Sequence, residues 1–193
     1  MKLSHFALSF IMLPLLASCA SSSEKAEKET VVPKTFDVVL PAGSYWNGKI
    51  FPPAGSCTTF GGLAKTPTFV VKKAPEGTNI ILIEFNNLSV KGLDKDGGLG
   101  TVGYVYKAPA DGSEVVLRSV PGGKVNLPRP AFLEKNHKVE GALPAAYFAP
   151  CLKRELDQEI SATVKAVKRT GNVYKQHTEV LDEVVIPLGT LKD

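Results

Sequence analysis

The sequence predicts a β-rich domain with at most one or two short helices. Seventeen glycines and fourteen prolines make up about one residue in six of the 193-residue chain, which favours short strands joined by turns. Residues 78–85 (TNIILIEF) form a nearly continuous run of apolar, β-branched residues of strand length. No stretch keeps a helical period of 3.6 residues over three turns. These three observations indicate a mostly β fold.

Four strands are predicted in the middle of the chain. Residues 78–85 are predicted to be a central strand, because a strand buried on both faces shows no polar alternation. Residues 68–72 (TFVVK) precede it across the turn at 75–77, and the two are predicted to form a strand–turn–strand unit. Residues 103–108 and 114–119 are predicted to form a second pair across a proline–glycine turn.

The C-terminal third contains one clear strand pattern and one ambiguous segment. Ile160, Ala162, Val164 and Ala166 alternate with polar residues, the period of a half-exposed strand. Residues 180–186 (VLDEVVI) permit a short helix as readily as a strand.

The first nineteen residues combine a positive charge, a short apolar stretch and a cysteine. Lys2 is followed by an almost wholly apolar stretch at 3–16, which is shorter than the roughly 20 residues that a membrane-spanning helix needs. The next residues, LASC, resemble a lipobox, in which the cysteine is acylated and becomes the new N-terminus. We therefore predict a signal peptide at 1–18 and lipidation of Cys19. An ordinary signal peptide with an incidental cysteine is the alternative.

Lipidation predicts a place in the cell envelope, with the membrane as a partner through the acyl chains. Two or three acyl chains anchor a protein stably, whereas one binds a membrane only marginally. Ala20 is not the aspartate that resembles an inner-membrane retention signal, so we predict an outer-membrane lipoprotein that faces the periplasm. Residues 19–35 are interpreted as the acylated cysteine and a flexible tether, and residues 36–193 as the folded β-rich domain.

Two cysteines remain once Cys19 is acylated. In an oxidising envelope an even pair is more often bonded than free, so Cys57 and Cys151 are predicted to form a disulfide. Two reduced, buried thiols are the alternative.

Little in the sequence predicts nucleic-acid or nucleotide binding. The net charge of +4 is spread along the chain without a basic run, which argues against a nucleic-acid-binding surface. Residues 98–103 match the dinucleotide-binding pattern GxGxxG, but a strand pattern follows them where that motif needs a helix. A flexible glycine-rich loop is therefore the prediction.

Metal binding and catalysis are not predicted either. Residues 94–97 (DKDG) fail the spacing of a calcium loop, because Leu99 and Val105 occupy its glycine and glutamate positions. His137 and His177 have no metal-binding spacing and are predicted to be surface residues. We predict a non-enzymatic protein without metal or cofactor. A hydrolase with a dispersed site remains a third hypothesis, because catalytic triads are spatial.

Four segments, in register across nearly the whole folded part, resemble the bacterial branch of the phosphatidylethanolamine-binding-protein family, also called Raf-kinase-inhibitor-like. They are NGKI through Cys57 with TPTF at 66–69, APEGT at 74–78 with its apolar strand, YFAPC at 147–151, and LGTL at 188–191. The resemblance implies an antiparallel Greek-key β-sandwich with one or two short peripheral helices. It also implies a ligand pocket bordered by the segment that contains Tyr147 and Pro150.

The chain departs from the family pattern at the chemistry of that pocket. Residues 87–91 (NLSVK) replace the family's D-P-D-A-P motif, and Val102 and Gly103 replace its H-W pair. Its H-R pair falls at about Gln158 and Glu159. The segment at 167–180 is short, so a family helix is predicted to be trimmed.

Neutral hydrogen-bonding groups beside aromatic rings remain at the predicted pocket. The predicted ligand-binding residues are Asn87, Tyr104, Tyr147, Pro150 and Gln158. Such a lining suits a small uncharged or zwitterionic ligand. Packing within the domain is the alternative role of these residues.

Two functions from different classes follow. The first is a lipid-anchored, non-enzymatic envelope protein that binds a small, phospholipid-headgroup-like ligand in a degenerate pocket. The second is a structural or inhibitor-type envelope lipoprotein with a vestigial pocket, in which the loops at 92–103 and 121–130 contact an envelope protein.

Overall fold

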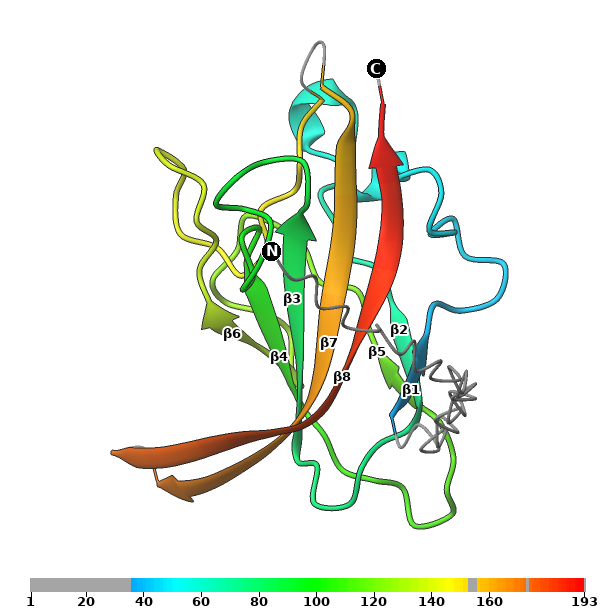
Figure 1. Ribbon diagram of the computed structural model, residues 1–193, viewed down its shortest axis with the longest axis vertical. Helices are drawn as coiled ribbons and strands as arrows, with labels where there is room; N and C mark the ends of the chain where they lie inside the picture. Colours follow the sequence, from blue (N-terminus) through cyan, green and yellow to red (C-terminus); the bar gives the residue numbers. More distant parts are fainter. Residues whose placement is uncertain (1–35, 153–155, 173, 193) are drawn as a thin grey trace, which may run out of the picture. The chain divides into compact units, whose positions relative to one another are not determined.

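Two antiparallel β-sheets build the domain in the computed structural model (Figure 1). The structure describes residues 36–152, 156–172 and 174–192. They belong to one of two units of the chain, Pro33–Asp193. The predicted signal peptide, Cys19 and the tether lie outside the described residues. Among the described residues, no helix is long and apolar enough to span a membrane.

The larger sheet has five strands in the order β6-β4-β3-β7-β8, and the smaller has three in the order β1-β2-β5. The larger contains β3 (Ile80–Asn87), β4 (Thr101–Val105), β6 (Ala131–Lys135), β7 (Gln158–Asn172) and β8 (Lys175–Leu191). The smaller contains β1 (Asp37–Val39), β2 (Phe69–Lys73) and β5 (Val115–Leu117). Two short 3-10 helices, η1 (Pro53–Gly55) and η2 (Thr58–Phe60), lie between β1 and β2. The predicted mostly β fold with short helices is confirmed.

Strand β3 is the centre of the larger sheet, as its apolar sequence predicts. It pairs with β4 on one side and β7 on the other, and seven of its eight residues are buried. Ile81, Ile83 and Phe85 point into the core between the sheets, because they belong to the main hydrophobic cluster. Glu84 and Asn86 alternate with them and lie on the opposite, outer face.

The predicted pairing of strands that are neighbours in sequence is wrong in both cases. β2 and β3 lie in different sheets, and so do β4 and β5, since β2 pairs with β5 and β3 with β4. The connections therefore cross between the sheets instead of closing hairpins. A turn-rich segment can close a hairpin or connect two sheets, so the local sequence pattern does not distinguish these two kinds of connection. The sequence pattern does not predict β1 and β6.

The ambiguous segment 180–186 belongs to a strand, β8, within a long hairpin. β7 has 15 residues and β8 has 17, and their paired ends next to the turn project beyond the other strands (Figure 1). Residues 174–180 of this end are exposed. The segment at 167–180, in which a family helix is predicted to be trimmed, therefore belongs to the two strands of a β-hairpin. Bulges at Ile160/Ser161 and Ala166/Val167 interrupt the pairing register.

The predicted disulfide is present and joins two distant loops. Cys57 and Cys151 are bonded across a sequence separation of 94 residues, and the amide of Cys57 also donates to the carbonyl of Pro150 at 3.0 Å. A crosslink over such a loop stabilises the fold by about 4–5 kcal/mol in the chain-entropy model. It holds the segment 147–152 against the loop that carries η1 and η2.

Candidate functional site

A small pocket lies where β3 ends and β7 begins. It has a volume of about 200 Å³. Its lining consists of Asn87, Val90, Leu93, Leu99, Val139, Phe148, Pro150, Cys151 and Gln158. None of these side chains carries a charge, and most are apolar. Three of the five predicted ligand-binding residues, Asn87, Pro150 and Gln158, thus meet at one pocket.

The polar part of the pocket is a chain of two amide groups. Nδ2 of Asn87 donates to Oε1 of Gln158 at 2.7 Å, and Nε2 of Gln158 donates to the carbonyl of Cys151 at 2.7 Å. Oδ1 of Asn87 accepts from the amide of Ser89 at 3.2 Å. Both side chains are almost fully buried. Each NH₂ group carries two hydrogens, and each uses one of them in the hydrogen bonds just described.

The chain positions these amides through its turns. After β3 the backbone closes a tight turn, in which Val90 donates to the carbonyl of Asn87 and Leu93 donates to that of Val90. The backbone N–H of Asn87 donates to the carbonyl of Leu93 at 2.8 Å. Gly92 adopts a positive φ of 87°, which the turn requires and glycine adopts without strain. The turn thereby brings Val90 and Leu93 to the wall beside Asn87.

Tyr104 and Tyr147 do not line this pocket, although they were predicted to. Tyr104 faces Ile81 across β3 and β4 on the core side, and its hydroxyl donates to the carbonyl of Arg118 at 2.7 Å. The hydroxyl of Tyr147 donates to the carbonyl of Gly55 at 3.1 Å, and its ring lies 4.8 Å from that of Phe85. Burial raises the pKa of both phenols well above their usual range. Both are core residues with satisfied hydroxyls.

Phe148, next to Tyr147 in sequence, lines the pocket instead. Its amide donates to the carbonyl of Leu99 at 2.7 Å, and Leu99 is another wall residue that the sequence analysis did not identify. Successive residues of an extended segment point in opposite directions, so only one of the two aromatic residues can face the pocket. The sequence contains no signal that distinguishes them, because both are large and aromatic.

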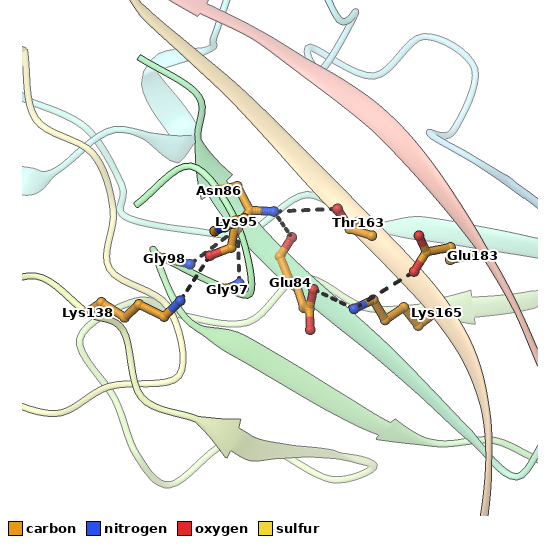
Figure 2. Close-up of polar contacts among 9 residues, drawn as sticks. All are labelled: Glu84, Asn86, Lys95, Gly97, Gly98, Lys138, Thr163, Lys165 and Glu183. Atoms are coloured by element: carbon orange, nitrogen blue, oxygen red, sulfur yellow. Dashed lines mark hydrogen bonds and ion pairs between the residues drawn. The ribbon is translucent and has the colours of Figure 1, made fainter. Parts of the chain in front are cut away.

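Asn86 on the outer face of β3 and Lys138 after β6 hold the glycine-rich loop that carries Leu99 (Figure 2). Oδ1 of Asn86 accepts from the amides of Gly97 at 3.0 Å and Gly98 at 3.2 Å. The ammonium of Lys138 donates to the carbonyl of Lys95 at 3.1 Å. Residues 97–100 of the loop are buried, so the prediction of a flexible loop and an exposed contact surface is wrong for this part. Most of the residues 121–130 are exposed, as that prediction requires.

A buried ion pair lies on the same outer face. Glu84, only 5% exposed, forms an ion pair with the ammonium of Lys165 at 2.9 Å, and Lys165 also approaches Glu183 at 3.8 Å (Figure 2). These residues alternate with the core residues of β3, β7 and β8 and point away from the pocket. We therefore assign them to the sheet and not to the pocket.

His137 is buried, which corrects the prediction of a surface histidine. Its Nδ1 accepts from the amide of Val139 at 3.2 Å, which places the ring proton on Nε2, the donor to the carbonyl of Leu143 at 2.8 Å. Both ring nitrogens are engaged by backbone, so this imidazole is a structural clamp beside Phe148. His177 is exposed on β8. Among the described residues, no cluster of three metal-ligating side chains occurs.

Comparison with known proteins gives a fold but no sequence relative. No family model matches the chain, and no curated protein matches it. A solved structure that is similar is that of E. coli YbcL, described as a new member of the mammalian PEBP (phosphatidylethanolamine-binding protein) family. The two share 15% sequence identity with a TM-score of 0.53, over 83% of this chain and 99% of that one. The chain has a PEBP-like fold. The fold that the four sequence segments imply is thereby confirmed.

Proposed function

We propose that this chain is a lipid-anchored, non-enzymatic protein of the bacterial cell envelope that binds a small ligand beside Asn87 and Gln158. The observation that carries the proposal is the neutral pocket of about 200 Å³ at this place in a PEBP-like fold. Its apolar walls and two amide groups favour an uncharged or zwitterionic group, such as a phospholipid headgroup. A group with a net negative charge is disfavoured, because no lining side chain supplies a cation.

The amides can serve both parts of a zwitterion. The unused N–H groups of Asn87 and Gln158 are donors for an ester or phosphodiester oxygen. The carbonyl oxygens of the same side chains and of Cys151 are acceptors for an ammonium group. The volume suits a headgroup and not a whole phospholipid, so acyl chains would remain outside.

Native mass spectrometry tests the binding. The native mass of a protein of residues 20–193, which contain every described residue of the domain, is measured with and without glycerophosphoethanolamine. The expected result is a one-to-one adduct that Gln158→Leu abolishes and Gln176→Leu retains, since Gln176 is an exposed glutamine on β8. An apo mass throughout, or equal adducts in both variants, would contradict the pocket assignment.

The anchor is tested separately in the full chain. Labelled palmitate is expected to enter the wild-type protein and not Cys19→Ser, and the protein is expected in the outer-membrane fraction. Label in the Cys19→Ser protein would contradict lipidation at this residue.

An interaction or inhibitor-type lipoprotein with a vestigial pocket is the second candidate. The specific observation in its favour is that Asn87 and Gln158 already bond each other and the backbone. The projecting hairpin, where Tyr174 is 96% exposed, is a surface that a partner protein could cover. An apo mass in the titration, with in-cell crosslinking from position 174 to one envelope protein, would favour this candidate.

A further inference from the structure

An exposed apolar surface lies on the loop between β1 and β2, apart from the pocket. Tyr45, Ile50 and Leu63 are 84%, 68% and 61% exposed. Tyr45, Ile50, Pro52 and Pro53 line a shallow groove of about 390 Å³, and Leu63 is tied to it because its amide donates to the carbonyl of Pro53. We call Tyr45, Ile50, Pro53 and Leu63 the loop face.

The loop face is held rigidly, so its exposure is built into the fold. The backbone on either side of Ile50 bonds to Thr190 of β8, through the carbonyl of Lys49 and the amide of Phe51, both at 3.0 Å. Oδ1 of Asn47 accepts from the amides of Lys49 at 2.9 Å and Ile50 at 3.0 Å. Beneath it, the rings of Trp46 and Phe51 meet edge to face at 5.1 Å. Large apolar side chains fixed in an exposed position indicate a binding surface.

The segment that carries the loop face has charges of one sign, and the exposed Glu159 of β7 lines a separate hollow together with Gly48. Residues 38–75 contain four lysines and no aspartate or glutamate. Lys49 adjoins Ile50, and Lys65 lines a second hollow on the other side of Tyr45. Both lysines are exposed, and neither forms an ion pair with another described residue. Apolar and aromatic side chains flanked by free ammonium groups complement an anionic lipid surface.

We propose that the loop face docks the domain onto an anionic phospholipid bilayer, with Ile50 and Leu63 entering the interface and Lys49 and Lys65 contacting the headgroups. For its location, this proposal rests on the envelope anchoring proposed above. The 17 residues at 19–35 span at most about 60 Å, so an acylated Cys19 would keep the domain near its bilayer.

A second copy of the chain is a less suitable occupant. A symmetric dimer would place the same loop on both subunits, so Lys49 and Lys65 of each copy would meet a loop that has lysines and no carboxylate of its own. A lipid surface supplies the missing negative charge.

Vesicle co-sedimentation of residues 20–193 tests this proposal without the acyl anchor. Vesicles of phosphatidylcholine with phosphatidylglycerol are compared with phosphatidylcholine alone, so that neither contains a phosphatidylethanolamine headgroup for the pocket. We expect salt-sensitive binding to the anionic vesicles only. Ile50→Ser/Leu63→Ser should weaken it at least about tenfold, because each side chain loses its apolar burial. Lys49→Gln/Lys65→Gln should weaken it several-fold.

Matched controls separate docking from folding and from the pocket. Val105→Ser/Val116→Ser changes two exposed apolar residues on β4 and β5, and Lys91→Gln/Lys107→Gln changes two exposed lysines elsewhere. Both controls, and Gln158→Leu, should bind vesicles like the wild type, while the loop-face variants should keep the adduct with glycerophosphoethanolamine. Absence of wild-type binding, or equal losses in loop-face and control variants, would overturn the proposal. So would a dimer that Ile50→Ser/Leu63→Ser dissociates.

Discussion

Asn87 and Gln158 are joined by a hydrogen bond of 2.7 Å although 71 residues separate them in sequence. The bond links the last residue of β3 to the first residue of β7, two strands that pair along their full shared length. The amide pair therefore links the two strands. It also supplies the only polar side chains among the described lining residues of the pocket. Binding and stability are therefore coupled at this site.

We expect Gln158→Leu to lower the free energy of unfolding by about 1–3 kcal/mol, because it leaves the buried amide of Asn87 without its acceptor. Asn87→Leu/Gln158→Leu should be less destabilised than the two single variants added together, because neither side-chain amide is then left buried without the other. Urea unfolding of the four proteins measures the coupling. Additive effects would mean that the two amides do not depend on each other.

The ion pair on the outer face gives a second stability prediction. Lys165→Met should cost about 3 kcal/mol, because it leaves the carboxylate of Glu84 buried without a counter-charge. Glu84→Gln/Lys165→Met should recover much of this loss, since no buried charge remains.

The exposed pair of Lys192 and Asp157 is the matched control for that measurement. Both side chains are more than 60% exposed, so Lys192→Met should change the free energy of unfolding by no more than about 0.5 kcal/mol. Equal midpoints for Lys165→Met and Lys192→Met in urea would show that Glu84 is solvated and not buried.

The sequence predicts the strands better than their partners. The run at 78–85 identifies β3 as central because burial on both faces removes the polar alternation, and this information is local. Whether β2 turns back on β3 or crosses to the other sheet depends on contacts that a short turn does not encode. β1 has only three residues, and most of the five residues of β6 are partly exposed, so neither strand has a clear sequence pattern.

The candidate site shows the same division. The register of the family-like segments predicts Asn87, Pro150 and Gln158 at the pocket, and the structure brings them to one pocket. Phe148 lines the pocket in place of the predicted Tyr147, which packs in the core. The direction of each side chain depends on the backbone of the disulfide-linked segment. His137 looks like a surface residue in sequence, yet two backbone groups clamp its ring.

The glycines of the GxGxxG pattern are expected to serve packing and not nucleotide binding. A Cβ on Gly100, whose φ is 110°, would collide with the backbone of Ala146, and one on Gly103 would collide with the ring of Phe132. We expect Gly100→Ala to cost at least about 2 kcal/mol through strain and overpacking.

Gly112 provides the control for the glycine prediction. Its φ is 70° and no atom lies within 4 Å of the place that an added methyl group would occupy, so Gly112→Ala carries only the backbone cost of about 1 kcal/mol. Thermal unfolding compares the two variants. A Gly100→Ala protein as stable as Gly112→Ala would mean that the loop moves freely away from Ala146.

Buried phenols predict a loss of stability in alkali. Burial raises the pKa of Tyr147 and Tyr104 in the folded state above the usual value of about 10. Above pH 10 the unfolded chain therefore binds fewer protons than the folded one. The free energy of unfolding then falls by about 1.4 kcal/mol per pH unit for each such tyrosine, whereas below pH 10 their contribution is constant.

Tyr147→Phe isolates one of these two contributions. At pH 7 it should be less stable than the wild type by about 1 kcal/mol, because the hydrogen bond to the carbonyl of Gly55 is lost. Above pH 10 the free energy of unfolding of the variant should fall less steeply than that of the wild type, by the contribution of one tyrosine. The difference in stability between the two proteins therefore shrinks and then reverses near pH 11. Urea unfolding between pH 7 and pH 11 gives both slopes. Parallel slopes for the two proteins would show that the Tyr147 hydroxyl ionises as readily folded as unfolded, and so is reached by solvent.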